Sequence, residues 1–487
     1  MGDDLGYGEL GAFGAQAITT PRLDALAAQG ARFTRAYAGY TVCAPSRTAL
    51  MTGRHSGSFL KANLSGTDIA PGEAVTLAEV LEGAGYATAV YGKSAPLKTP
   101  EGSGFDAFLG QVDQTACHNM YPSAIDDGVA GEGGVPLPLN AAGNRSREEC
   151  MAHPERYNYT VDVFTQGALG WLDAHVSPHG ADRSPFFLYL SLTVPHAGGW
   201  TDKGAEQGSP VPTNFQYASR SDWPEVERDH AAAVTYMDAA FGAVLDRLDA
   251  LGVAKNTLVL AASDNGAHLE GGHSVTFFNS TGGLRGHKRS MYEGGVRSPT
   301  IVRWPGVVSP GSVSAFPWAF WDLLPTLAEV AGNTKSVPGD VDGISILPTL
   351  RGMPQRRAEQ DFLFFTGNTD WADAPTSAAG LPQEVKGGAV TDGAPVVTAY
   401  SVVVGELKAV AKECANQPST QDKLQIFNIS ADPFETHDLA ATPEGAAHAQ
   451  AILELVVPRN LSCACYQCGI SWRDFEMHAE SAPMKQP

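Results

Sequence analysis

One cysteine in the chain stands where a reactive group could face an anion. Cys43 lies between an extended stretch, residues 32–40, and a helix-like stretch in which Pro45 suits the first turn. At a helix N-terminus, unpaired backbone N–H groups and the helix dipole both favour a bound anion. Arg47 follows one turn later and can add a charge-assisted pair of hydrogen bonds to the same anion. The Cys-x-Pro pattern alone is equally compatible with a buried structural cysteine that precedes a helix.

Four polar residues offer only oxygen atoms as ligands, namely Asp3, Asp4, Asp264 and Asn265. Carboxylate and amide oxygens are the ligands that a hard cation such as Ca²⁺ prefers. Taken alone, an Asp-Asp pair or an Asp-Asn-Gly turn is usually a solvated loop. Each pair by itself therefore does not establish a metal site.

Strands and helices alternate through the first three quarters of the sequence, which is typical of a parallel or mostly parallel sheet covered by helices. Short apolar runs predict buried strands at residues 86–91, 185–192 and 258–262. A helix is predicted over residues 225–251, before the last strand. Lys93, His196 and the pair Asp264-Asn265 each follow one of these strands. Because ligands bind at the carboxyl ends of strands in open α/β sheets, we expect these side chains to converge on one crevice.

The segment at residues 43–54, CAPSRTALMTGR, closely resembles the signature of the sulfatase family. Other segments similar to sulfatase motifs follow in the family's order, at residues 3–8, 91–93, 194–196, 263–266, 286–289, 293–299 and 424–439. The resemblance spans nearly the whole chain. It implies an arylsulfatase-like hydrolase that cleaves sulfate esters to an alcohol and inorganic sulfate.

The resemblance also implies a modified nucleophile and a metal ion. In the family, a separate formylglycine-generating enzyme oxidises the signature cysteine, here Cys43, to formylglycine. One hydroxyl of the hydrated aldehyde attacks sulfur and displaces the alcohol, and the other then allows sulfate to be expelled. The resemblance assigns Ca²⁺ to Asp3, Asp4, Asp264 and Asn265, together with the modified residue 43.

Charged residues complete the implied site. Lys93 and Lys288 would bind sulfate as point charges, and Arg47 would stabilise the developing charge. His196 would contact the bridging oxygen and, together with Lys288, help to protonate the leaving alcohol. Without the resemblance, the lysines would be interpreted as solvated surface side chains and the histidine as structural.

The implied fold class is α/β, with a large mostly parallel sheet sandwiched by helices in the alkaline-phosphatase-like manner. We expect this catalytic domain over residues 1–356 and a smaller C-terminal α+β subdomain over residues 357–487. The subdomain would contain a surface loop at 369–395, a small antiparallel sheet near 397–410 and a helix over 444–456.

Two features depart from the sulfatase pattern. The family's Gly-Lys-x-His motif has Ala95 in place of its histidine, and this loss is expected to slow the release of sulfate. His118 is a possible neighbour of the site. The apolar strand that precedes Asp-Asp in sulfatases is also absent, so we expect Asp3 and Asp4 to hang from a free terminus.

The bulk composition excludes some partners. The net charge is -20 and no long Lys/Arg run occurs, which argues against nucleic acid and anionic membrane surfaces. No apolar run approaches the roughly 18 residues of a membrane span. The most apolar stretch, residues 316–331, carries Asp322 and Glu329 and predicts an amphipathic helix.

The cysteines and glycosylation sequons favour a secretory route. Seven cysteines leave at least one thiol unpaired, for which Cys43 is the candidate. Cys463, Cys465 and Cys468 favour disulfides, although zinc is conceivable in principle. Asn-x-Ser/Thr sequons occur at Asn63, Asn144, Asn158, Asn279, Asn428 and Asn460, as in a glycoprotein. Met1 is followed by neither a charged start nor an apolar run, so no signal peptide is expected from these residues.

Two other functions remain open. A phosphatase or phosphodiesterase of the same superfamily would normally offer Ser or Thr as nucleophile and further ligands for two zinc ions, so Cys43 and the oxygen-only ligands favour sulfate. A catalytically impaired sulfatase-like binding protein would account for Ala95. The substrate could be an aryl sulfate, a sulfated sugar or a polysaccharide end, and residues 118–158 and 198–222 are the candidate specificity loops.

Overall fold

The computed structural model describes most of the 487-residue chain. The described residues are 1–59, 62, 64, 66–114, 116–128, 135–140, 146–176, 184–199, 208–368, 398–411, 418–420 and 422–461. The predicted loop at 369–395, the sequons at Asn63 and Asn144 and the three C-terminal cysteines lie outside them.

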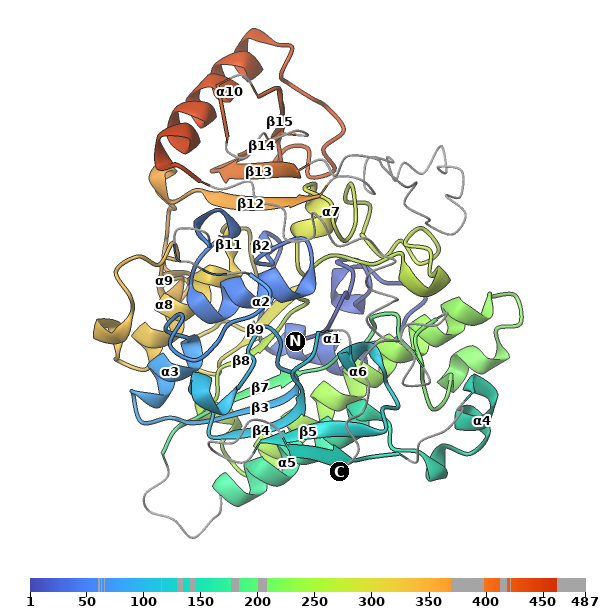
Figure 1. The fold of residues 1–487 in the computed structure, drawn as a ribbon. Coiled ribbons are helices and arrows are strands. Elements are labelled where there is room, and N and C mark those ends of the chain that lie inside the picture. The colour runs from blue at the N-terminus through green and yellow to red at the C-terminus, as the bar shows by residue number, and fades with distance from the viewer. Residues whose placement is uncertain are drawn as a thin grey trace, which may run out of the picture.

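The centre of the molecule is a mixed sheet in two halves (Figure 1). The first half has the order β6 (Val135–Pro138), β5 (Ala124–Gly128), β4 (Ala107–Gln111), β3 (Ala87–Lys93) and β7 (Phe186–Ser191). The second has the order β8 (Val259–Ala261), β9 (Thr300–Arg303), β1 (Ala31–Phe33) and β10 (Ser312–Ser314). Strand β3 pairs in parallel with β4 and β7, whereas β5, β6, β8 and β9 make antiparallel pairs. The three predicted strands are therefore present as β3, β7 and β8, although β7 and β8 are only partly buried.

The first three residues of the chain join the two halves. The Leu192 amide donates to the Met1 carbonyl oxygen at 3.0 Å, and Asp3 forms a parallel bridge with Pro195. On the other side, Gly2 forms a parallel bridge with Ser263, just after β8. The expectation that Asp3 and Asp4 hang from a free terminus was wrong, because residues 1–3 pair on both sides in the place of a central strand.

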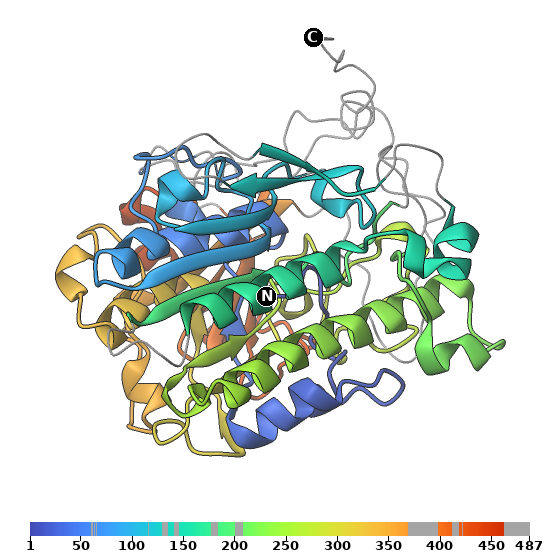
Figure 2. The ribbon, with the colours of Figure 1, turned by 90° about the horizontal axis from the view of Figure 1, so that it is seen from below.

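Helices cover both faces of the sheet and bury separate cores. Figure 2 shows α5 (Thr160–His175), α6 (Glu225–Ala250) and α1 (Pro21–Gln29) side by side along one face. The other face carries α2 (Cys43–Thr52), α3 (Leu77–Glu82) and α8 (Leu323–Val330). Successive residues of a strand point to opposite faces. Accordingly, Ala89 and Tyr91 of β3 enter the core with α5 and α6, whereas Val90 enters the core with α3 and α8.

A four-stranded antiparallel sheet with one helix forms the C-terminal part at the top of Figure 1. Its elements are β12 (Leu363–Asn368), β13 (Thr398–Val404), β14 (Leu407–Ala411), β15 (Leu424–Asn428) and α10 (Pro443–Val456). Phe365 packs toward the larger domain and Phe364 toward α10. The buried Lys408 ammonium lies 2.8 Å from Glu293, which ties this sheet to a motif of the larger domain. The boundary at 356/357 stays a prediction.

The remaining elements are short: β2 (Ala36–Tyr37), β11 (Trp318–Ala319), α4 (Arg147–Ala152), α7 (Glu293–Val296) and α9 (Leu347–Leu350). The predicted helix at 316–331 was too long, since Trp318 and Ala319 pair with β2 as a strand and the α-helix begins only at Leu323. Among the described residues, no helix combines the length and apolarity that crossing a membrane requires.

Candidate active site

Cys43 is the first residue of α2, as the position of Pro45 predicts. Val42 before it is extended, and every residue of the helix is buried. Burial raises the pKa of the Cys43 thiol well above its usual value, and the neighbouring Asp3 carboxylate adds to the rise. A thiol held in its protonated form is a poor nucleophile.

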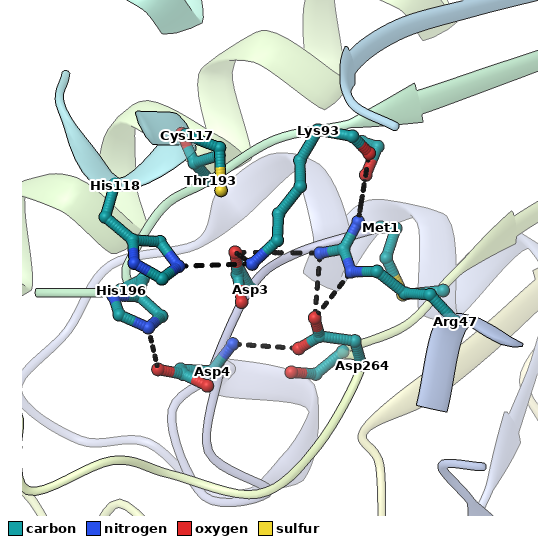
Figure 3. Close-up of polar contacts among 12 residues, drawn as sticks. Met1, Asp3, Asp4, Arg47, Lys93, Cys117, His118, Thr193, His196 and Asp264 are labelled. Atoms are coloured by element: carbon teal, nitrogen blue, oxygen red, sulfur yellow. Dashed lines mark hydrogen bonds and ion pairs between the residues drawn. The ribbon is translucent and has the colours of Figure 1, made fainter. Parts of the chain in front are cut away.

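Three of the predicted metal ligands, Asp3, Asp4 and Asp264, lie close together (Figure 3). Asp3 and Asp4 also lie close to Cys43. Asp3, Asp4, Asp264 and Asn265 are all fully buried. The Asp4 amide donates to Asp264 Oδ1 at 3.1 Å, and Asn265 Nδ2 donates to Asp4 Oδ1 at 2.6 Å. The loop after β8 and the first residues of the chain are thereby held together, so the two predicted pairs form one site.

Two oxygen atoms of this group, Asp3 Oδ1 and Asn265 Oδ1, have no hydrogen-bond partner among the described residues. An unpaired buried oxygen is costly unless something binds it. Asp3, Asp4, Cys43 and His196 also offer ligand atoms within 4.8 Å of one another. Burial, followed by the Asp3 charge, raises the pKa of Asp264 to about 7. The donors present therefore fit a hard cation.

The positive charges of Lys93, Lys288 and Arg47 balance the negative charges of the three carboxylates of this group. Lys93 Nζ lies 2.9 Å from Asp3 Oδ2, and Lys288 Nζ lies 2.7 Å from Asp4 Oδ2. Burial opposes the charge on Asp3, but Lys93 and then Arg47 hold the pKa of that carboxyl well below its usual range. With the three carboxylates ionised, a divalent cation would leave the site with net positive charge, which suits an anionic ester.

Arg47 differs from the expectation of a free fork toward an anion. Its Nε donates to Asp264 Oδ2 at 2.8 Å, and Nη2 lies 2.7 Å from the same oxygen. Its Nη1 donates to Ser191 Oγ and, at 3.3 Å, to the Tyr189 hydroxyl. The guanidinium therefore holds a metal-ligand candidate against β7, which sequence spacing could not show.

His196 and Lys288 lie together on the side of Asp4. The Nδ1–H of His196 donates to the Ala197 carbonyl oxygen, which leaves Nε2 as an acceptor. Lys288 Nζ lies 3.0 Å from that Nε2. The pair has the donor and acceptor atoms that proton transfer to a leaving oxygen requires.

Sequence analysis missed Glu270 and His268, and it left His118 only as a possible neighbour. Glu270 Oε2 lies 2.7 Å from Lys288 Nζ, and Oε1 lies 2.5 Å from Arg289 Nη1. His268 Nε2 donates to the Pro195 carbonyl oxygen at 3.1 Å, beside His196. The signal for both was their place in the loop that carries Asp264 and Asn265.

We refer to one group of residues as the Cys43 cluster: Asp3, Asp4, Cys43, Arg47, Lys93, His196, Asp264, Asn265 and Lys288. The structure brings all of these predicted site residues together.

A second buried group lies next to it and is called the Glu9 cluster: Glu9, Glu227, His230 and His273. His230 Nε2 lies 2.6 Å from Glu9 Oε1, and His273 Nδ1 lies 2.7 Å from Glu227 Oε2. The two imidazole rings stack at 3.7 Å. Each imidazole is therefore hydrogen-bonded to its own carboxylate.

Comparison with known proteins points to one family. A family model described as Sulfatase matches residues 1–333. Steryl-sulfatase of Rattus norvegicus is 33% identical over 415 residues, which cover 75% of this chain and 71% of that protein. Arylsulfatase A of Homo sapiens is 32% identical over 486 residues, which cover 91% of this chain and 83% of that protein.

A solved structure extends the likeness to the fold. A protein whose structure was solved in complex with its substrate D-glucosamine-2-N,6-O-disulfate matches with a TM-score of 0.63 at 19% identity, over 97% of this chain and 98% of that one. The α/β fold class expected from the sequence is confirmed. The chain therefore belongs to the sulfatase family, a family of sulfuric ester hydrolases.

Proposed function

We propose that the chain hydrolyses sulfate esters through a formylglycine made from Cys43, with a calcium ion bound beside it. The observation that carries this proposal is the convergence of three carboxylates and three cations on the first residue of a buried helix. A charged constellation of this kind is costly to bury and is retained where it binds a ligand.

Calcium would be held by Asp3, Asp4, Asp264 and Asn265, with residue 43 adjoining. The unpaired oxygens Asp3 Oδ1 and Asn265 Oδ1 support this set. When bound, the ion would supply positive charge to the sulfate oxygens. Arg47 holds Asp264 through two of its nitrogen atoms and so keeps one ligand in place.

The buried thiol supports a need for chemical conversion, because its raised pKa leaves little thiolate. Formylglycine, as its hydrate, would supply a hydroxyl nucleophile at the helix N-terminus. Lys93 would bind a sulfate oxygen, and the Lys288 ammonium would give a proton to the leaving oxygen with His196 beside it. The cellular partner for this conversion would be a formylglycine-generating enzyme.

The proposed substrates are sulfated small molecules or sulfated glycans. The relatives include a steryl-sulfatase and an arylsulfatase, and one structural neighbour was solved with a disulfated glucosamine. A secretory glycoprotein remains part of the proposal, supported by the exposed sequon residues Asn158, Asn279 and Asn460. Residues 118–158 and 198–222 stay the candidate specificity loops.

The test uses the full chain produced together with a formylglycine-generating enzyme. Release of a chromogenic phenol is measured from an aryl sulfate and from the matching aryl phosphate, with calcium and with a calcium chelator. We expect calcium-dependent turnover of the sulfate in preference to the phosphate. The His437→Gln variant is the control, because His437 is 83% exposed and far from the site in sequence.

Each alternative function gives a different result in this assay. Preferred turnover of the phosphate would favour a phosphatase or phosphodiesterase. Binding of the sulfate ester without turnover, by protein that carries the aldehyde, would favour an impaired sulfatase-like binding protein. Either outcome would contradict the proposal.

A further inference from the structure

Lys93 has an imidazole neighbour that its own motif does not provide. The family-like motif has Ala95 where a histidine is expected, and the chain leaves the site there, since Leu97 pairs with Ile69. The imidazole comes from a 3-10 helix, Ala116–His118, that follows β4. His118 Nε2 lies 3.2 Å from Lys93 Nζ (Figure 3).

We propose that His118 is a positioning residue for Lys93, supplied by a segment outside the Lys93 motif, which has Ala95 where the family has a histidine. The inference rests on the proposed function, because it concerns how the sulfate-binding ammonium is aimed. His118 acts through Lys93 and is not assigned contact with the reacting atoms.

The hydrogen-bond capacity of Lys93 gives the physical reason. An ammonium group has three donors and no acceptor. One donor of Lys93 is directed at Asp3 Oδ2 at 2.9 Å and a second at His118 Nε2, which leaves a third for a sulfate oxygen. Burial, and then the neighbouring His196 and Lys93, lower the pKa of His118, so the ring is neutral and its Nε2 can accept. Without His118, Asp3 would be the one hydrogen-bond partner among the described residues that fixes the direction of the third donor.

The backbone holds His118 at this position. The Gly199 amide donates to the His118 carbonyl oxygen at 3.0 Å, and Asn119 forms a parallel bridge with Gly199. A Cβ on Gly198 would lie 2.3 Å from the same carbonyl oxygen, so this approach requires glycine. The position of His118 therefore depends on the position of the segment that follows His196.

The ring of His118 is also fixed from one face. It stacks on the His196 ring with centroids 3.8 Å apart and an interplanar angle of 11°. A phenylalanine could keep this stack but could not accept a hydrogen bond. A glutamine could accept the hydrogen bond but would lose the aromatic stack. These two substitutions separate the two contacts of the residue.

The experiment measures binding of inorganic sulfate by calorimetry to the full chain with unmodified Cys43, with calcium present. We expect His118→Phe to weaken binding about tenfold, because it removes a hydrogen bond to the charged ammonium of Lys93. His118→Gln should bind within about threefold of the wild type, because it keeps an acceptor for Lys93. On the aldehyde-bearing enzyme, the same order should appear in kcat/KM for the aryl sulfate.

Sulfate binding by His118→Phe at the wild-type level would overturn the inference. Equal losses in both variants, together with a lowered unfolding temperature, would assign His118 a merely structural role and would also overturn it. A wild-type chain that neither binds sulfate nor hydrolyses the ester would instead contradict the proposed function.

A second variant tests the same inference without altering the imidazole. Gly198→Ala should displace the His118 carbonyl oxygen and weaken sulfate binding in the same direction as His118→Phe. Gly170→Ala is the matched control, because Gly170 lies in α5 and an added Cβ there meets no atom within 4 Å. Unchanged sulfate binding in Gly198→Ala would contradict the dependence on His118 placement.

Discussion

The Cys43 cluster and the Glu9 cluster are both buried, charged and rich in carboxylates, yet they differ in how their oxygen atoms are used. In the Glu9 cluster, Glu9 accepts hydrogen bonds from the Gly6 amide and from His230. Glu227 accepts from the Ser274 amide and from His273. In the Cys43 cluster, Asp3 Oδ1 and Asn265 Oδ1 accept no hydrogen bond from the part of the chain that the structure describes.

This difference separates a group that stabilises the fold from one that is open to a ligand. Saturated carboxylates hold α6 against the loops that follow Asp4 and Asp264. The unpaired oxygen atoms of Asp3 and Asn265 are instead available to a ligand. His268, whose ring lies 5.3 Å from those of His230 and His273, stands between the two clusters. Changes in the Cys43 cluster should therefore affect activity first, and changes in the Glu9 cluster should affect stability first.

The largest effect is expected for Cys43→Ala, which removes the side chain that formylglycine is made from. Turnover of an aryl sulfate should fall by at least about a thousandfold, because the remaining charges have no nucleophile to assist. The free energy of unfolding should change far less. Initial rates measured beside denaturant unfolding check this prediction, and substantial residual turnover would contradict it.

Glu9→Gln should cost stability. Burial opposes ionisation of Glu9, but His230 lowers its pKa to about 2 from 4.5, which corresponds to about 3 kcal/mol. A depressed carboxyl pKa stabilises the fold above pH 4.5, and the contribution is lost as pH falls toward about 2. The difference in unfolding free energy between wild type and Glu9→Gln should therefore have its largest value near neutral pH and decrease below pH 4.5.

The same variant, Glu9→Gln, should retain its catalytic activity. At a temperature where the variant is folded, its kcat/KM should stay within a few fold of the wild-type value. Equal stabilities of the two proteins at neutral pH would show that the Glu9 cluster does not stabilise the fold as described.

Asp3→Asn should weaken calcium binding by about thirtyfold or more, because it removes a charged ligand candidate and leaves Lys93 without its carboxylate. Titration of the protein with calcium alone measures this change. Asp222→Asn is the matched control, since Asp222 is 65% exposed and pairs only with Arg220 among the ion pairs of the described residues. Equal calcium affinities of the two variants would show that Asp3 is not a ligand of the metal ion.

The smallest effect is expected for Ser280→Ala. The Ser280 hydroxyl supports the Glu9 cluster through Glu9 and lies 3.4 Å from His273 Nε2. Loss of one such hydrogen bond should lower the free energy of unfolding by about 1 kcal/mol. Thermal unfolding measures this change in stability. A large loss of turnover in this variant would contradict the prediction that the Glu9 cluster affects stability rather than activity.

Much of the Cys43 cluster was predictable from the sequence, because its members follow strands whose carboxyl ends meet at one edge of the sheet. Lys93 ends β3, and Asp264 follows β8. The start of α2 at Cys43 was also predictable, since Pro45 favours the first turn.

The rest depends on contacts between distant segments. His118 reaches Lys93 because its segment pairs with Gly199. The pattern of apolar residues near residue 118 does not predict that pairing. The pairing of residues 1–3 on both sides is equally invisible in their own sequence. The hydrogen bonds of Arg47 to Asp264, Ser191 and Tyr189 likewise depend on bringing together three separate elements.

The most direct test of the central claim is mass spectrometry of the peptide that contains Cys43, from protein made with and without a formylglycine-generating enzyme, alongside sulfate release by the same samples. We predict the aldehyde only in the first sample, with calcium-dependent sulfate release in proportion to the aldehyde content. Sulfate release by protein in which Cys43 is wholly unmodified would contradict the proposed nucleophile, as would complete conversion without any release.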